Sequence, residues 1–126
     1  MPDLLKILIV DDDPYISEMY TTKFKSEPLF QLELAGNGKE ALEKAASFQP
    51  QVMLLDVIMP IFDGFEVLKK LKESGALGTM KVIILSNLGQ KEDIERGLQL
   101  GATDYIIKAH FTPSEVMEKV KQVVSK

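Results

Sequence analysis

The amino-acid sequence predicts an α/β fold in which five short strands alternate with five helices in a single domain, residues 1–126. Apolar runs at residues 6–10, 51–55 and 81–85 are typical of parallel strands that are buried on both faces. Stripes of apolar residues with helical spacing lie between and after these runs. No linker rich in proline, glycine or serine divides the chain, which favours one domain over two.

The remaining two strands are less apolar than the first three. Residues 30–34 alternate between apolar and polar side chains, which indicates a strand at an exposed edge of the sheet. Residues 104–107 form a fifth, shorter run. Each helix is predicted from apolar residues three or four positions apart: Ile16, Met19, Tyr20 and Phe24; Ala41, Leu42, Ala45 and Ala46; Phe65, Leu68 and Leu71; Ile94 and Leu98; Val116, Val120, Val123 and Val124.

Residues that favour helix ends agree with these stripes. A polar side chain that accepts a hydrogen bond from the first turn is typical of a helix start, and glycine is typical of a position just after a helix. The expected starts are at Asp13, Asn37, Asp63 and Thr112, and Gly101 favours a helix end.

Strict alternation with right-handed crossovers places helices on both faces of the sheet. For a chain of 126 residues we expect a flavodoxin-like doubly wound (βα)5 fold with the strand order 2-1-3-4-5. Ligands of such folds bind outside the carboxyl ends of the strands, between the first and third strands. A functional site is therefore expected at that edge.

Composition excludes several classes of function. The chain has no cysteine, so it holds neither a disulfide nor a cysteine-based zinc site. Its formal net charge of −4 argues against direct nucleic-acid binding. The apolar run at residues 7–10 is far shorter than a signal-peptide core or a membrane span. We therefore expect a cytoplasmic protein without membrane insertion.

Polar side chains follow four of the five predicted strands. Asp11 and Asp12 follow the first strand, Asp56 the third, Ser86 the fourth and Lys108 the fifth. The carboxyl ends of parallel strands meet at one edge, so these acidic, hydroxyl and ammonium groups are expected to converge there. One polar residue after one strand would mean little, but this set at four strand ends indicates a site.

The chemistry of the expected site follows from its charges. Neighbouring carboxylates disfavour one another's ionised form unless a cation lies between them, and Mg²⁺ is a cation that carboxylate oxygens bind well. Aspartate is also a phosphoryl acceptor in covalent catalysis. A metal ion and Lys108 would neutralise charge on the transferring oxygens, and Ser86 could donate a hydrogen bond to the acquired phosphoryl group.

The stretches ILIVDDDP, LLDVIMPIFDGFEVL, VIILSN and DYIIK resemble receiver domains of response regulators, and most closely the single-domain chemotaxis-regulator type. The most specific part is Asp56 to Pro60 followed by Asp63 and Gly64. The resemblance implies that Asp56 is the phosphoacceptor of a Mg²⁺-dependent reaction. It also implies that Asp12 binds the metal directly, that Asp11 acts mainly through bound water, and that the backbone carbonyl of Ile58 is a further ligand.

The same resemblance implies a switch and its partners. Ser86 would be the hydroxyl switch residue, Lys108 would pair with the acceptor and its phosphoryl group, and Tyr105 would be the aromatic switch residue. The phosphoryl group would come from a sensor histidine kinase or a phosphotransfer protein. The output partner would bind the face formed by the fourth helix, fifth strand and fifth helix. Such a domain promotes its own phosphorylation and dephosphorylation and is not a turnover enzyme.

The residue after Lys108 departs from the family pattern. Receiver domains usually have proline there, often after a cis peptide bond, and this chain has Ala109. A cis bond before a residue other than proline costs about 2.5–4 kcal/mol. Either the loop at residues 108–111 runs differently or it holds a strained cis bond.

Two apolar residues flank the expected phosphoryl site. Ile58 and Leu88 lie two positions after Asp56 and Ser86. We expect these side chains to shield the phosphoryl group from water and so lengthen its lifetime.

Other functions fit the sequence less well. A flavodoxin-type electron carrier would need a phosphate-binding loop after the first strand, where three aspartates, residues 11–13, would repel a flavin phosphate. A haloacid-dehalogenase-type phosphatase would need threonine or valine where Tyr15 stands. A receiver-like adaptor that works without phosphorylation remains the alternative. The sequence leaves open whether the chain is a stand-alone receiver or part of a longer regulator.

Overall fold

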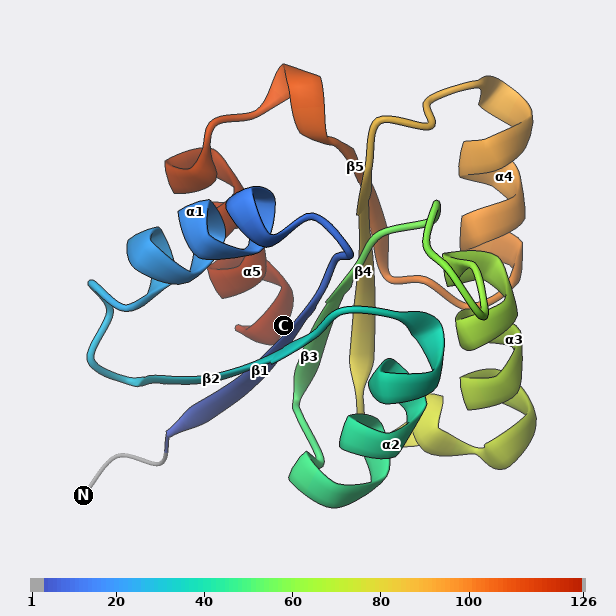
Figure 1. Cartoon of the computed structure of the whole chain (residues 1–126), viewed down its shortest axis with the longest axis horizontal. Coiled ribbons are helices and arrows are strands. Elements are labelled where there is room, and N and C mark those ends of the chain that lie inside the picture. Colours follow the sequence, from blue (N-terminus) through green and yellow to red (C-terminus); the bar gives the residue numbers. More distant parts are fainter. Residues whose placement is uncertain (1–3, 126) are drawn as a thin grey trace.

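The computed structural model describes residues 4–125, and these residues form one five-stranded parallel sheet in the order β2-β1-β3-β4-β5 (Figure 1). The predicted α/β class and strand order are confirmed. The strands are β1 (Leu5–Val10), β2 (Phe30–Ala35), β3 (Val52–Leu55), β4 (Lys81–Ser86) and β5 (Asp104–Ile107).

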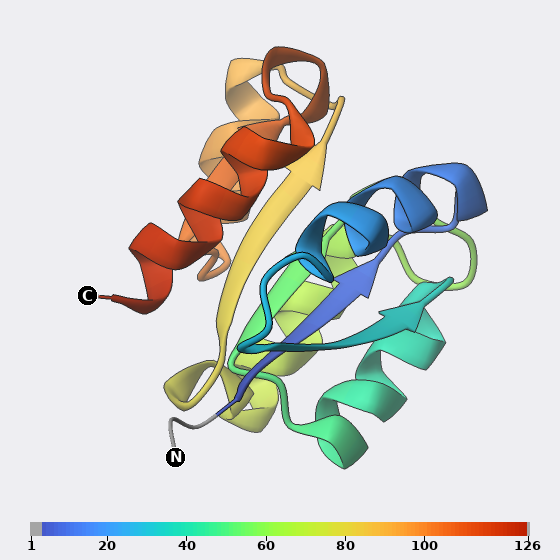
Figure 2. The ribbon, with the colours of Figure 1, turned by 90° about the vertical axis from the view of Figure 1, so that its left-hand side faces the viewer.

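Helices cover both faces of the sheet. They are α1 (Pro14–Phe24), α2 (Gly38–Phe48), α3 (Gly64–Ser74), α4 (Lys91–Gln99) and α5 (Pro113–Val124). Helices α1 and α5 lie together on one face, and α2, α3 and α4 lie on the other (Figures 1 and 2). Two short 3₁₀ helices, η1 (Ala76–Gly78) and η2 (Lys108–His110), are additions to the prediction. Three residues are too few for a periodic sequence pattern to reveal.

The sheet separates two hydrophobic cores. Side chains alternate across a strand, so Ile7 and Ile9 pack toward α1 and α5, whereas Leu8 and Val10 pack toward the opposite helices. All four side chains are buried. Burial on both faces explains why the central strands are continuously apolar, and the edge position of β2 explains why that strand alternates.

The predicted helix starts are confirmed by side-chain hydrogen bonds. The Tyr15 amide donates to the Asp13 carboxylate at 2.9 Å, and the Glu40 amide donates to Asn37 Oδ1 at 2.8 Å. Reciprocal capping boxes begin α3 at Asp63 and α5 at Thr112. Gly101, with φ of +108°, follows the end of α4 in the left-handed region that glycine tolerates.

The loop from β3 to α3 is folded tightly against Asp56. The Gly64 amide donates to the Val57 carbonyl at 2.7 Å. A Cβ atom on Gly64 would lie 2.2 Å from the Asp56 carbonyl oxygen and 2.8 Å from Val57 Cα. Both are backbone atoms, which cannot move aside as a flexible side chain could. Glycine at position 64 is therefore required for α3 to begin this close to Asp56.

We predict that Gly64→Ala destabilises the protein by about 1–3 kcal/mol, the usual range for overpacking. Urea denaturation measures the change, with Gly78→Ala as the control because no atom lies within 4 Å of the Cβ that alanine would add there. Equal stability of the two variants would contradict the close approach at Gly64.

Candidate functional site

Three carboxylates meet at the carboxyl edge of the sheet. Strands β1 and β3 pair with Val10 opposite Leu55, so the next residues, Asp11 and Asp56, lie side by side. Asp12 completes the group, and one oxygen from each of the three carboxylates lies within 4.8 Å of the others. Asp11 and Asp56 are only 6% and 8% exposed, whereas Asp12 faces solvent. The predicted convergence of these acidic residues is what the structure shows.

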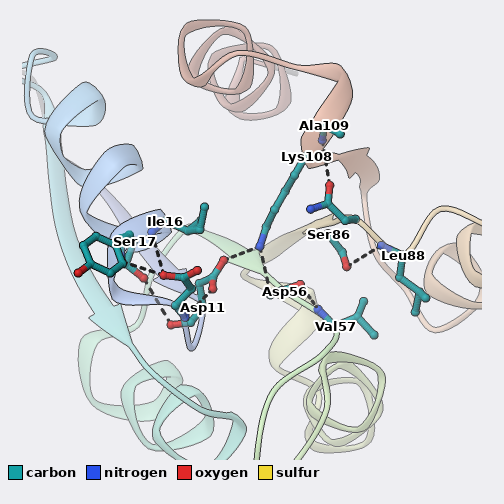
Figure 3. A network of polar contacts seen from close by, with 12 residues as sticks. Asp11, Ile16, Ser17, Asp56, Val57, Ser86, Leu88, Lys108 and Ala109 are labelled. Atoms are coloured by element: carbon teal, nitrogen blue, oxygen red, sulfur yellow. Dashed lines mark hydrogen bonds and ion pairs between the residues drawn. The ribbon is translucent and has the colours of Figure 1, made fainter.

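Lys108 connects two of the carboxylates. Its Nζ atom lies 2.6 Å from Asp11 Oδ2 and 3.0 Å from Asp56 Oδ2 (Figure 3). The second oxygen of each carboxylate accepts a hydrogen bond from a backbone amide: the Asp13 amide donates to Asp11 at 2.9 Å, and the Val57 amide donates to Asp56 at 2.7 Å. These four contacts fix the orientation of both buried carboxylates before any ligand binds.

The electrostatics of the site reflect its burial. Burial raises the pKa of Asp56, although the charge and hydrogen bond of Lys108 act in the opposite direction. For Lys108, burial lowers the pKa, but the hydrogen bond to Asp11 and the charge of Asp56 outweigh burial and leave the pKa raised. The ammonium group therefore stays protonated at neutral pH. Three carboxylates and one ammonium leave a net negative charge that a divalent cation would neutralise.

The donor set fits a hard divalent cation. Mg²⁺ binds carboxylate oxygens and keeps several water molecules, so it needs a partly open site. Asp12 is exposed beside the two buried carboxylates, which gives such an ion access from solvent. The residues that could hold the ion are Asp11, Asp12 and Asp56.

Ser86 lies across the edge from the carboxylates. It is the last residue of β4, rather than the residue after the strand, and it is 1% exposed. The Leu88 amide donates a hydrogen bond to Ser86 Oγ at 3.1 Å (Figure 3). A cavity of about 280 Å³ opens beside this hydroxyl group, lined by Asp56, Ile58, Ser86, Asn87, Leu88 and Lys108.

Tyr105 connects β5 to the loop that follows Ser86. Its hydroxyl group donates to the Leu88 carbonyl, and its partly buried ring packs over Gly97 of α4. Burial, followed by the charges of Asp93 and Asp56, raises the pKa of Tyr105 to about 12. The predicted switch residues Ser86 and Tyr105 are thus linked through one segment, the β4–α4 loop.

The loop after Lys108 takes the different path that Ala109 allowed. No cis peptide bond occurs within residues 4–125, so the alternative of a strained cis bond is wrong. The chain instead forms the η2 turn, and the Ala109 amide donates to Asn87 Oδ1 at 3.0 Å. Lys108 nevertheless reaches the carboxylates. Asn87 was missed by sequence reasoning, and its position directly after Ser86 was the signal that could have identified it.

Known proteins resemble the chain over most of its length. A family model described as "Response regulator receiver domain" matches residues 7–121. Protein-glutamate methylesterase/protein-glutamine glutaminase 1 of Syntrophomonas wolfei is 44% identical over 108 residues, covering 82% of this chain and 29% of that protein. Alkaline phosphatase synthesis transcriptional regulatory protein PhoP of Bacillus subtilis is 34% identical, covering 94% of this chain and 48% of that protein. This chain thus spans less than half the length of either relative.

Solved structures agree with these matches. A CheY-like response regulator receiver domain protein from Methanospirillum hungatei has a TM-score of 0.89 at 29% identity, covering 98% of this chain and 95% of that chain. The response regulator domain of Thermotoga maritima CheB has a TM-score of 0.87 at 28% identity, covering 98% of both chains.

The helices within residues 4–125 are all too short or too polar to cross a membrane.

The raised pKa of Asp56 generates a prediction about stability. The folded protein binds the Asp56 proton more tightly than the unfolded chain does. The contribution of Asp56 to the free energy of unfolding therefore falls as the pH rises from its ordinary pKa of 3.8 through its raised pKa in the folded protein. In Mg²⁺-free buffer, Asp56→Asn should therefore gain stability relative to the wild type over this window. Urea titrations at a series of pH values measure the difference.

Glu92→Gln is the matched control, because it removes one exposed carboxylate from α4, outside the acidic cluster. We expect its stability to follow the wild type. A relative loss of stability in Asp56→Asn as the pH rises would show that Lys108 outweighs burial and would contradict the account.

Proposed function

Because this chain belongs to the family of response regulator receiver domains, we propose that it is the phosphoacceptor switch of a two-component signalling system. Asp56 would receive the phosphoryl group from a phosphohistidine of a sensor kinase or phosphotransfer protein. The observation that carries the proposal is the convergence of Asp11, Asp12, Asp56 and Lys108 at the carboxyl edge of the sheet.

Mg²⁺ is the proposed cofactor, held by Asp12 and Asp56 directly, by the backbone carbonyl of Ile58 and by Asp11 mainly through bound water. When bound, the ion would offset negative charge on the phosphoryl oxygens. The support for this set is the carboxylate cluster, whose negative charge Lys108 balances only in part.

The proposed reaction is an in-line displacement. A carboxylate oxygen of Asp56 attacks phosphorus, a P–O bond forms, and the P–N bond to histidine breaks with its electron pair left on the imidazole nitrogen. Lys108 Nζ lies 3.0 Å from Asp56 Oδ2 in the unphosphorylated protein. It is therefore close enough to pair with the negatively charged phosphoryl oxygens on Asp56. The buried backbone bond from Val57 keeps the acceptor carboxylate oriented during the attack.

Ser86 is the proposed sensor of the phosphoryl group. Its hydroxyl group lines the cavity beside Asp56 and can donate a hydrogen bond to a phosphoryl oxygen there. Movement of Ser86 would draw the β4–α4 loop inward through the hydrogen bond from Leu88. The Leu88 carbonyl accepts from Tyr105, so this motion would shift the aromatic ring at the α4–β5–α5 face, where we place the output partner. Phosphorylation would thus shift the populations of two conformations.

We predict a gain of one phosphoryl group when the protein is incubated with acetyl phosphate and Mg²⁺. Intact-protein mass measures the gain. Asp56→Asn and removal of Mg²⁺ should each abolish it, and Glu92→Gln should leave it unchanged because Glu92 lies outside the cluster. Absence of any gain in the wild type would favour an adaptor that works without phosphorylation.

The apolar side chain of Ile58 generates a prediction about the phosphoryl lifetime. Ile58 is 67% exposed and lines the cavity that holds Asp56, where we expect its side chain to restrict the approach of water. We expect Ile58→Asn to shorten the lifetime about 3- to 10-fold, because general-base or water-positioning effects of a polar group are commonly at least this large. The decay of phosphorylated protein after donor removal gives the rate.

Ile61→Asn is the control for that experiment. Ile61 is also an exposed isoleucine of the β3–α3 loop, at 63%, and it is absent from the lining of this cavity. The phosphoryl lifetime of Ile61→Asn should match that of the wild type. An equal effect of both substitutions would contradict local shielding by Ile58.

A further inference from the structure

A hydrogen bond joins the β4–α4 loop, which follows Ser86, to the η2 turn, which begins at Lys108. The Ala109 amide donates to Asn87 Oδ1 at 3.0 Å (Figure 3). Asn87 directly follows Ser86, and Ala109 directly follows Lys108. The bond therefore joins the chain neighbours of two groups that face the same cavity.

The bond lies where regular strand pairing has ended. The last aligned pair of β4 and β5 is Ser86 with Ile107. Beyond it, β5 turns into η2, which begins at Lys108, and β4 turns into the loop before α4. A side-chain acceptor at Asn87 thus extends the connection between the strands by one step, to the turn that sets the backbone of Lys108.

The donor depends on the residue at position 109. Proline has no amide proton and could not make this bond, whereas alanine can. The family pattern favoured proline after Lys108. Proline would have restricted the backbone of this turn, whereas here the hydrogen bond from the Ala109 amide to the Asn87 side chain holds the turn in place.

Lys108 needs such support because its backbone and its head group are held at different places. Its Nζ atom is fixed by Asp11 and Asp56, but those carboxylates are also the proposed partners of Mg²⁺ and of the phosphoryl group. When these partners change, the head group must move while the base of the side chain stays. The bond at Ala109 lies next to that base, and it is made by a backbone amide and an amide side chain rather than by a carboxylate.

We propose that Asn87 is a positioning residue for Lys108, which it holds in place through the Ala109 amide. This role rests on the proposed function, in which Lys108 contacts the transferring phosphoryl group. Because the same bond joins the η2 turn to the residue after Ser86, Asn87 also makes the β4–α4 loop and the η2 turn move together.

The test substitutes Asn87→Ala, with His110→Ala as the matched control. His110 is an exposed residue of the same turn, and its side chain supplies neither atom of the Asn87–Ala109 bond. Amide hydrogen exchange at Ala109 reports the bond without any phosphorylation. The rate of phosphorylation by acetyl phosphate at saturating donor and Mg²⁺ reports Lys108, and the Mg²⁺ dissociation constant, from a titration, reports the metal site.

We expect Asn87→Ala to accelerate exchange at Ala109 by about 2- to 10-fold, the range given by the net free energy of one exposed hydrogen bond. It should slow phosphorylation at saturating donor by a similar factor, with the apparent KM for donor and the Mg²⁺ dissociation constant unchanged. His110→Ala should match the wild type in all four measurements. If Asn87→Ala instead disrupted the structure of the whole site, the Mg²⁺ dissociation constant would change as well.

Three results would overturn the positioning role: unchanged exchange at Ala109, faster exchange with an unchanged phosphorylation rate, or a changed Mg²⁺ dissociation constant. A wild-type protein that takes no phosphoryl group would overturn the proposed function itself, and the role of Asn87 with it. That failure is distinguishable, because exchange at Ala109 would still show whether the bond exists.

Discussion

The contacts of Lys108 Nζ with Asp11 and Asp56 are the interaction on which the rest of the site depends. They join residues that follow β1, β3 and β5, whose carboxyl ends lie at the same edge because the sheet is parallel and has the order 2-1-3-4-5. A buried carboxylate without a partner is costly, so the ammonium makes it feasible to bury Asp11 and Asp56 together. One ammonium cannot balance three carboxylates, and the remaining negative charge makes the edge receptive to a divalent cation.

The surrounding structure keeps this edge in a defined geometry. Gly64 allows α3 to begin against the backbone of Asp56, and the Val57 amide orients the Asp56 carboxylate. On the other side, the Leu88 amide holds Ser86 Oγ, and the Leu88 carbonyl accepts from Tyr105. The buried carboxylates are therefore rigidly placed, whereas the β4–α4 loop is held by a few separate hydrogen bonds. A change at Asp56 would be transmitted more easily through that loop than through the β3–α3 loop.

Much of this arrangement could be predicted from the sequence because local patterns determine it. Continuous apolar runs identify the central strands, and the rule that ligands bind at the carboxyl ends of strands predicts that Asp11, Asp56 and Lys108 lie close together. The η2 turn is too short to leave a periodic pattern in the sequence. The bond from Ala109 to Asn87 could not be predicted either, because it joins residues 22 positions apart through one side chain. The absence of proline showed that the loop would differ, but no local pattern specified which residue would hold it.

A crystal structure with Mg²⁺ and beryllium fluoride, a phosphoryl analogue, is the measurement that tests the central claim most directly. The account predicts the analogue on Asp56, the metal bound by Asp12, Asp56 and the Ile58 carbonyl, and fluorine atoms in contact with Lys108 Nζ and Ser86 Oγ. Lys108 should have exchanged at least one of its carboxylate contacts for the analogue. The account would be contradicted if the metal and the analogue bound elsewhere. It would also be contradicted if Lys108 kept its contacts with both carboxylates and made none with the analogue.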